Sequence, residues 1–194
     1  MLLPTSFFLD TNALILLSGL DTDNLSILNR EIAEKEIKIC VTHVQIDEKY
    51  THELGDYRQN IEKALEKLAK NGINIIVENT IELVLGISRL GYAKLGSEKL
   101  GEIDDALRKE IETCMGKKAK GDLNVASDAL IALSSLNHDF FITADRCLFK
   151  SWKIVIDFNK ENKKAIEQHG YKVPKIIHRK KPKGVFQAIM NVIT

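Results

Sequence analysis

Short apolar runs separated by stretches of helical periodicity constrain the fold of this chain more than any other feature of its sequence. Such runs, rich in Ile, Val and Phe and bounded by polar residues, are typical of buried strands. Strands that alternate with helices indicate an α/β fold, in which helices on both sides cover a parallel sheet of about five strands. The predicted strands are residues 7–9, 37–41, 73–77, 140–143 and 153–157.

Capping residues and periodicity predict the helices between these runs. Asn12 is expected to cap a short helix through Leu17. Thr42 and Gln45 have the spacing of a capping box, which predicts a helix that carries Glu48 near its start. Further helices are predicted over residues 21–35, 56–70, 122–136 and 160–169, and residues 80–118 are predicted to form helices broken around Gly91, Gly96 and Gly101.

Length and charge favour one main domain with a basic extension. With 194 residues and 44% hydrophobic content, the chain can bury one substantial core. Lys and Arg number 28 against 27 acidic residues, so the net charge of +1 gives no overall nucleic-acid signature. The segment 172–184 is basic and contains no acid, which predicts a boundary between a domain over residues 1–158 and an extension over residues 159–194.

The cysteines and the amino-terminal residues favour a cytoplasmic protein. Cys40, Cys114 and Cys147 are odd in number and have no C-x-x-C spacing, which argues against a disulfide framework and a structural zinc site. Residues 1–9 contain no basic leader, and the apolar stretch 13–17 is far shorter than the roughly 20 residues that span a bilayer. We therefore expect a protein of the reducing cytoplasm without a membrane segment.

Two of the apolar runs lead into an aspartate. Asp10 directly follows the first run, and Asp145 comes two residues after the run that ends at Thr143. If both runs are parallel strands, both carboxylates emerge at the carboxyl edge of the sheet, where open α/β sheets bind their ligands. Glu48 and Asp128 lie on predicted helices, and a few converging carboxylates are the ligands that Mg²⁺ or Mn²⁺ prefers. The sequence therefore predicts a divalent-metal site.

Each acid taken singly has a simpler interpretation. An aspartate after a strand can merely cap the following turn, and an acid on a helix is usually solvated. Asp128 fits this less well, because it directly precedes an apolar run and so lies close to a buried stripe. Asn124 shares its helix face and is a candidate for a supporting contact, whereas Asp122 is better explained as a cap. Asp47 competes with Glu48, since adjacent helix residues point about 100° apart.

Four short motifs, taken in their order and spacing, resemble the PIN-domain nucleases. They are Phe7-Phe8-Leu9-Asp10-Thr11-Asn12, Val41-Thr42-His43-Val44-Gln45-Ile46-Asp47-Glu48, Ser127-Asp128-Ala129-Leu130-Ile131-Ala132 and Ile142-Thr143-Ala144-Asp145-Arg146. The resemblance covers about residues 6–158. It implies a three-layer α/β/α sandwich and cleavage of single-stranded or structured RNA with Mg²⁺ or Mn²⁺. It most often implies the toxin of a toxin–antitoxin pair, with an antitoxin protein as partner and a homodimer as the oligomeric state.

The resemblance also implies roles for individual residues. The acids that would hold the metal are Asp10, Glu48, Asp128 and Asp145, and the polar residues that match beside them are Thr11, Asn12 and Thr143. Many members of the family have a further acid two residues after the last one, where this chain has Cys147, which leaves a second metal open. Residues 160–194 have no counterpart that we identify.

The sequence leaves open both the role of the basic segment and the class of function. Arg179, Lys180, Lys181 and Lys183 are candidate contacts to an RNA backbone, but the segment could equally be a solvated tail or serve dimer contacts. RNA processing outside a toxin module is an alternative, as is a non-catalytic binding module, although four acids without a metal would repel one another. A phosphatase of the haloacid dehalogenase type is disfavoured, because Asn12 stands where its second aspartate is needed. The five histidines show no metal-binding spacing, so surface or capping roles are expected for them.

Overall fold

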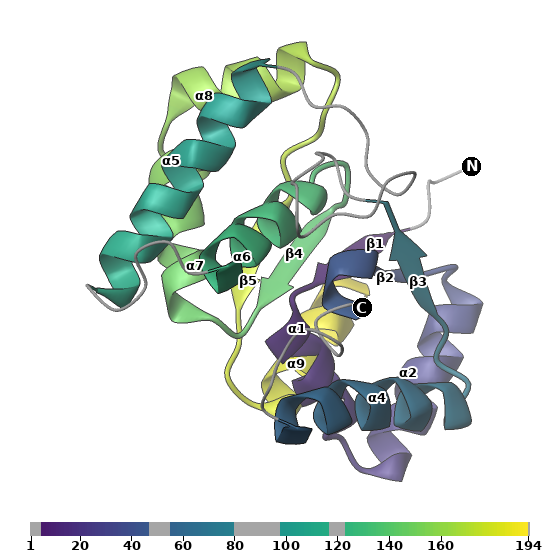
Figure 1. Cartoon of the computed structure of the whole chain (residues 1–194). Helices are drawn as coiled ribbons and strands as arrows, with labels where there is room; N and C mark the ends of the chain where they lie inside the picture. Colours follow the sequence, from purple (N-terminus) through teal and green to yellow (C-terminus); the bar gives the residue numbers. More distant parts are fainter. Residues whose placement is uncertain (1–4, 47–54, 80–97, 117–122, 194) are drawn as a thin grey trace.

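The computed structural model describes residues 5–46, 55–79, 98–116 and 123–193, and it contains a five-stranded parallel sheet (Figure 1). The strands are β1 (Ser6–Leu9), β2 (Lys38–Thr42), β3 (Ile75–Glu78), β4 (Phe140–Thr143) and β5 (Lys175–His178). Their order across the sheet is β3-β2-β1-β4-β5, and every neighbouring pair is parallel. The predicted α/β fold is therefore confirmed.

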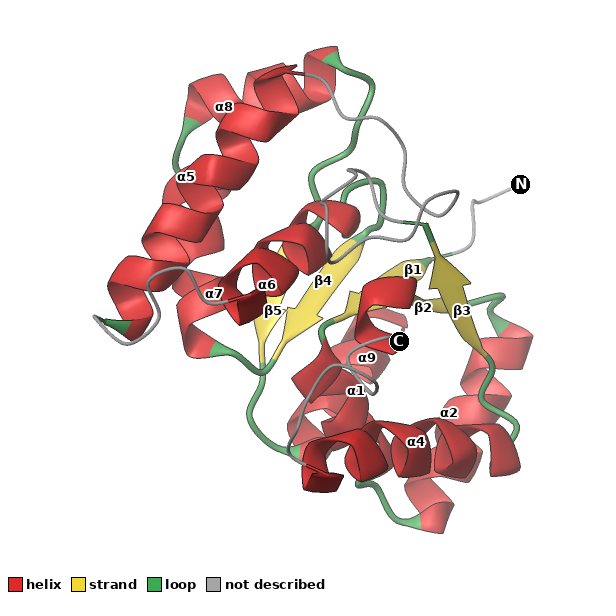
Figure 2. Ribbon diagram, viewed as in Figure 1, coloured by secondary structure: helices red, strands yellow, loops and turns green. Residues whose placement is uncertain are grey.

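Helices cover both faces of this sheet (Figure 2). One face packs against α5 (Glu98–Met115), α6 (Leu123–Ser134), α7 (Arg146–Trp152) and α8 (Lys160–Gln168). The other packs against α1 (Thr11–Ser18), α2 (Thr22–Glu34), α4 (Gly55–Lys70) and α9 (Pro182–Ile193). Because successive strand residues point to opposite faces, Phe8 enters the first core while Phe7 and Leu9 enter the second. The protein is thus a three-layer α/β/α sandwich.

The first four strands lie at the predicted apolar runs, but the predicted strand at 153–157 is wrong. These residues form a π-helical turn, η2 (Lys153–Asp157), that continues directly from α7. Asp157, at the end of this turn, contacts two residues at its start, because its carboxylate accepts a hydrogen bond from the Trp152 indole nitrogen at 3.2 Å and forms an ion pair with Lys153. Local side-chain contacts thus hold the segment helical despite its strand-like composition.

The segment expected as an extension contributes to the same sheet and core. Its residues 175–178 form β5, which pairs with β4 along its whole length. Its final helix, α9, buries Val185, Ala188 and Ile189 in the core that also contains α1 and α2. The basic segment therefore includes an edge strand and the loop that follows it.

At the end of β2 the Gln45 side of the predicted capping box is confirmed, whereas two other helix predictions are wrong. The Thr42 backbone nitrogen donates to Gln45 Oε1 at 2.6 Å, and residues 43–46 are helical. The cap of α1 is Asp10 instead of Asn12, because the Asp10 carboxylate reaches the Ala13 backbone nitrogen.

The second wrong prediction is a helix break at Gly101. Helix α5 continues through Gly101, since one glycine costs a helix interior only about 1 kcal/mol and this helix buries Ile103, Leu107 and Ile111 in the first core. Gly91 and Gly96 lie outside the described residues. Within the described ranges, no helix combines the length and apolar character needed to traverse a bilayer.

Candidate active site

Asp10 lies at the carboxyl end of β1, and its side chain is fixed by hydrogen bonds on both oxygens. Oδ1 accepts from the Ala13 backbone nitrogen at 2.6 Å, which caps α1. Oδ2 accepts from the Thr143 hydroxyl and from the Ala144 backbone nitrogen, the latter at 3.1 Å. Only 4% of Asp10 is exposed, so its carboxylate is held in one orientation within the protein.

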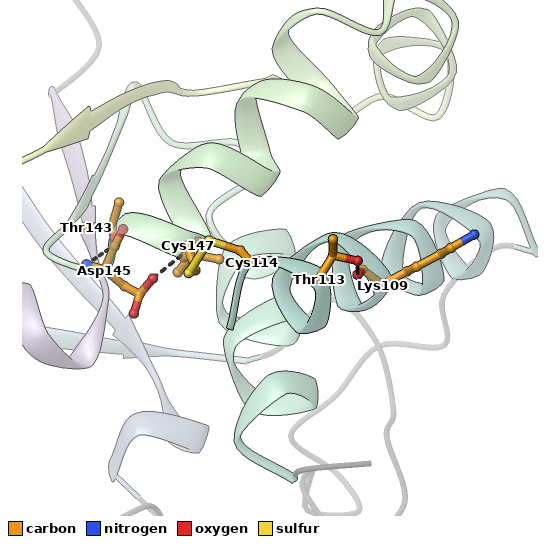
Figure 3. Close-up of a disulfide and its surroundings, with 7 residues drawn as sticks. Lys109, Thr113, Cys114, Thr143, Asp145 and Cys147 are labelled. Carbon is orange, nitrogen blue, oxygen red and sulfur yellow. Dashed lines mark hydrogen bonds between the residues drawn. A yellow bond between two sulfur atoms is a disulfide. The ribbon is translucent and has the colours of Figure 1, made fainter. Parts of the chain in front are cut away.

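Thr143 connects Asp10 with Asp145, and Figure 3 shows the Thr143–Asp145 part of this connection. Strand β4 pairs directly with β1, with Ile142 opposite Leu9, so the residues that follow both strands emerge side by side. While the Thr143 hydroxyl donates to Asp10, its oxygen accepts from the Asp145 backbone nitrogen at 3.0 Å. The two aspartates therefore stand at neighbouring positions on the carboxyl edge of the sheet, joined through one buried hydroxyl.

Asp145 repeats the capping arrangement of Asp10. Its Oδ1 accepts from the Leu148 backbone nitrogen at 2.7 Å and caps α7. The residue is half-buried, in contrast to the buried Asp10. Each aspartate thus has a structural role as a helix cap, which accounts for its position after a strand without any metal.

The electrostatics of Asp10 go beyond what a cap requires. Burial raises the pKa of its carboxyl group from 3.8 to about 6, although the hydrogen bonds from Thr143, Ala13 and Ala144 act in the opposite direction. In the part of the chain that the structure describes, neither Asp10 nor Asp145 forms an ion pair with Lys or Arg. A buried carboxylate without a counter-charge is costly, and a bound cation would offset that cost.

The structure gives less detail on the other two predicted acids, Asp128 and Glu48. Asp128 is half-buried on α6, which leads through a short turn into β4 and so runs back along that strand. Its amino-terminal half, with Asp128, therefore lies toward the carboxyl edge. Glu48 lies outside the described residues, although the helical residues 43–46 lead toward it. The Asn124 side chain is likewise outside the part of the chain that the structure describes.

The remaining polar candidates differ in burial. Thr11 is buried at the first position of α1, whereas Asn12 is exposed on the same helix. Thr143 is fully buried, and its hydroxyl contacts the predicted acid Asp10 directly. Thr143 is therefore a polar candidate that the structure joins directly to one of the acids.

A basic residue follows β5 at the same edge of the sheet, and three lysines come after it in the chain. Arg179 follows β5 directly, and its backbone nitrogen donates to the Thr143 carbonyl oxygen at 2.9 Å. Lys180, Lys181 and Lys183 come next in the chain and carry further positive charge. The four positive charges thus begin one strand away from the Asp10–Thr143–Asp145 group, which the sequence alone does not reveal.

The cysteine argument against a disulfide framework is wrong, because the structure contains a disulfide. Cys114, near the end of α5, is bonded to Cys147 in the first turn of α7, with their Cα atoms 5.5 Å apart (Figure 3). Sequence spacing did not reveal the pair, because a disulfide depends on proximity in space and not on a local motif. Cys147 lies two residues after Asp145, so this bond ties α5 to the helix that Asp145 caps. The cysteine argument for a reducing compartment is thereby removed.

Sequence reasoning also missed a mixed group of possible metal ligands. Among the described residues, Cys40, Glu78 and His138 are the only three His, Cys, Asp or Glu side chains whose ligand atoms all lie within 4.8 Å of one another. The described predicted acids, Asp10, Asp128 and Asp145, do not bring three ligand atoms within 4.8 Å of one another. No spacing signal could have identified the mixed group, because its members come from three separate segments of the chain.

Fold and site together define an α/β/α sandwich with hydrogen-bonded aspartates at the carboxyl edge of its central strands. Comparisons with protein-family models, curated proteins and solved structures found no match. The function is therefore argued from the residues and their geometry.

Proposed function

We propose that this protein is a metal-dependent endoribonuclease that hydrolyses RNA phosphodiesters. The observation that carries the proposal is the buried Asp10 carboxylate, which has no counter-charge among the described residues and is joined through Thr143 to the backbone of Asp145. Its role as a helix cap explains its position but not its burial, since an exposed aspartate caps α2 equally well at Asp21.

The residues at this edge suit Mg²⁺ or Mn²⁺. Both ions prefer oxygen ligands and retain several waters, so carboxylates from Asp10 and Asp145, with Asp128 and Glu48 as further donors, suffice without a tight cage. When bound, such an ion activates a water for attack on phosphorus and stabilises charge on the departing oxygen. The contribution of this chain is orientation, because the hydrogen bonds to Asp10 fix its oxygens before any ion arrives.

The basic residues after β5 support RNA as the substrate. Arg179, Lys180, Lys181 and Lys183 follow the strand beside the carboxylates and provide positive charge for a phosphate backbone. Thr143 contacts both segments, since its hydroxyl donates to Asp10 and its carbonyl oxygen accepts from the Arg179 backbone nitrogen. Binding through these residues weakens as salt rises, because the counterions that binding releases must then enter a more concentrated solution.

The biological setting of this activity has two versions. In one the protein is the toxin of a toxin–antitoxin pair, and an antitoxin segment covers the carboxylate edge; in the other it processes cellular RNA without such a partner. A non-catalytic module that binds RNA or protein is the alternative from a different class. An RNA cleavage assay separates this last alternative from a nuclease.

The test is cleavage of a mixed RNA pool by protein prepared free of contaminating RNases, with Mg²⁺, Mn²⁺ or chelator. We expect cleavage with either ion, none in chelator, and a loss of at least about 100-fold in Asp10→Asn, which retains a capping side chain but loses the charge. Asp21→Asn is the matched control, since it changes the exposed aspartate cap of α2, leaves Asp10, Thr143 and Asp145 intact, and removes only a negative charge near Lys183, which does not weaken phosphate binding.

The outcomes decide between nuclease and binding module. Cleavage lost in Asp10→Asn and kept in Asp21→Asn supports the proposal. Cleavage that survives Asp10→Asn, or wild-type protein that neither cleaves RNA nor melts at a higher temperature when Mn²⁺ is added, contradicts it.

A further inference from the structure

A second group of potential ligands lies apart from the aspartates. Cys40 belongs to the central part of β2, Glu78 ends β3, and His138 lies in the turn that precedes β4. Their ligand atoms all lie within 4.8 Å of one another, and His138 Nε2 is 3.1 Å from Glu78 Oε2. Three different segments of the chain therefore contribute one sulfur, one nitrogen and one oxygen donor to a single point.

Sheet register explains part of this convergence. Cys40 pairs with Ile76, and Glu78 follows Ile76 by two residues, so Cys40 and Glu78 point to the same face of the sheet. His138 is held on that face by Phe8, the neighbour of Cys40 on β1, with the two ring centroids 5.1 Å apart. The positions of all three side chains are thus set by the core of the protein and not by a surface loop.

The group is largely buried, and one ring nitrogen of His138 has no hydrogen-bond partner in the described structure. Cys40 is fully buried and 5% of His138 is exposed, whereas the Glu78 side chain is 40% exposed and opens the group to solvent. Within the described structure, the buried His138 Nδ1 has no hydrogen-bond partner. Buried polar atoms of this kind are uncommon in folded proteins, so the protein alone does not satisfy every polar atom of this group.

The chemistry of the group without an ion is that of a neutral thiol beside a carboxylate. Burial, followed by the nearby Glu78 charge, raises the pKa of the Cys40 thiol to about 12. The hydrogen bond with His138 lowers the pKa of Glu78 despite its partial burial, so Glu78 is the charged member. Lys38 is the other charge that acts on both groups.

We propose that Cys40, Glu78 and His138 form a site for a divalent transition-metal ion, and that zinc is the ion it takes. Cysteine sulfur, histidine nitrogen and carboxylate oxygen are the three donors that zinc uses in proteins, whereas Mg²⁺ and Ca²⁺ require oxygen ligands. Three protein ligands would leave one ligand position for water, and the exposed Glu78 side chain is where solvent reaches the group. Binding converts the Cys40 thiol to a thiolate, and its proton is released to solvent.

The expected consequence is attachment of the edge strand β3 to the centre of the sheet. Every residue of β3 retains partial exposure, while β2 beside it buries four of its five residues. An ion held by Glu78 on β3, Cys40 on β2 and His138 before β4 links three segments across the sheet. This site does not rest on the proposed nuclease activity, because it shares no residue with the aspartate group.

The experiment uses full-length protein stripped with a chelator and then titrated with Zn²⁺ or Co²⁺. We expect one zinc per chain, a higher melting temperature, and a thiolate-to-cobalt charge-transfer absorption in the Co²⁺ complex. Cys40 is the only thiol not in a disulfide, so the absorption reports on this site alone. Glu78→Gln should weaken zinc binding at least about tenfold, and Cys40→Ser should abolish the cobalt–thiolate absorption.

Controls separate this site from others. His169→Gln changes an exposed histidine on a different element and should bind zinc as wild type does. Asp10→Asn should lose RNA cleavage but keep the cobalt–thiolate absorption, which distinguishes failure of one proposal from failure of the other. Folded wild-type protein without the absorption, or Glu78→Gln with unchanged zinc affinity, overturns the zinc site; circular dichroism verifies that each variant is folded.

Discussion

At the scale of single residues, Asp10 combines two roles. Its Oδ1 caps α1, and its carboxyl group is buried beside Thr143 without an ion-pair partner among the described residues. A cap favours helix formation, whereas burial of the charge opposes folding. The sequence predicted an acid at this strand end, but it could not predict the burial, because that depends on how the neighbouring strand and helices close around the side chain.

Because Asp10 is buried, we predict that the stability of the metal-free protein depends on pH. Its carboxyl pKa is about 6 in the fold against 3.8 for an unperturbed aspartate, so the stability contributed by the protonated form is complete below pH 3.8 and is lost as pH rises through 6. Asp10→Asn does not titrate and escapes this loss. We expect the free energy of unfolding of Asp10→Asn, relative to that of wild type, to increase by about 3 kcal/mol between pH 3.5 and pH 7.5.

Urea unfolding at the two pH values measures this difference. Other titrating groups are common to both proteins and cancel when the change of Asp10→Asn relative to wild type is compared between the two pH values. Asp21→Asn serves as the control, because the exposed Asp21 carboxyl has a lowered pKa in the fold. The stability of this variant relative to wild type should therefore decrease as pH rises, opposite to the change expected for Asp10→Asn. An Asp10→Asn difference that stays constant with pH would contradict the burial of an unpaired charge.

At the scale of secondary structure elements, the site depends on the segment that comes after each strand. Strands β1 and β4 each lead within two residues into a helix whose cap is an aspartate, and β5 leads into the basic residues before α9. Parallel pairing brings these three ends to one edge of the sheet. The disulfide adds a covalent tie between α5 and α7 close to this edge.

The disulfide predicts a large effect of reduction on stability. The two cysteines are 33 residues apart, and closing a loop of that size in the unfolded chain stabilises the fold by about 3–4 kcal/mol. Reduction should therefore lower the melting temperature by roughly 7–15 °C. Thermal melts of metal-free protein with and without a phosphine reductant provide the measurement.

The control for reduction is the double variant Cys114→Ser with Cys147→Ser. It should melt at the temperature of the reduced wild type and should not respond to the reductant, since the remaining Cys40 is a free buried thiol. A wild-type melting temperature that reductant leaves unchanged would show that the bond does not stabilise the fold.

At the scale of the whole molecule, the carboxyl-terminal residues complete the sandwich. Without β5, strand β4 would be an exposed edge, and without α9 the core shared with α1 and α2 would lose a buried face. An open sheet edge and an uncovered apolar surface both destabilise the isolated domain. The proposed active site then loses its support, because Thr143 on β4 pairs with His178 on β5.

We therefore predict that a chain ending at residue 158 does not fold. Thermal unfolding followed by circular dichroism should show no cooperative transition in this fragment under conditions where the full chain melts sharply.

Point variants of α9 test the same packing in the full chain. Val185→Asp should lower the free energy of unfolding by several kcal/mol because Val185 is buried, while Asn191→Asp on the exposed side of α9 should change it by less than about 0.5 kcal/mol. A cooperative melt of the fragment ending at residue 158, near the melting temperature of the full chain, would disprove the need for β5 and α9.

The sequence by itself determined the fold class, four of the five strands and the aspartates that come after two of them. These features depend on local patterns, namely the length of an apolar run, its composition and the residue that ends it. The error at residues 153–157 has the same origin, since Ile and Val favour a strand locally while contacts of Asp157 with Trp152 and Lys153 hold a helical turn.

Only the tertiary structure decided which distant residues meet. It joined Cys114 to Cys147, brought Cys40, Glu78 and His138 together, and made residues 175–178 the fifth strand. It also buried the Asp10 carboxyl beside Thr143, 133 residues further along the chain. The physical reason is that proximity and burial depend on packing between elements, which no short stretch of sequence contains.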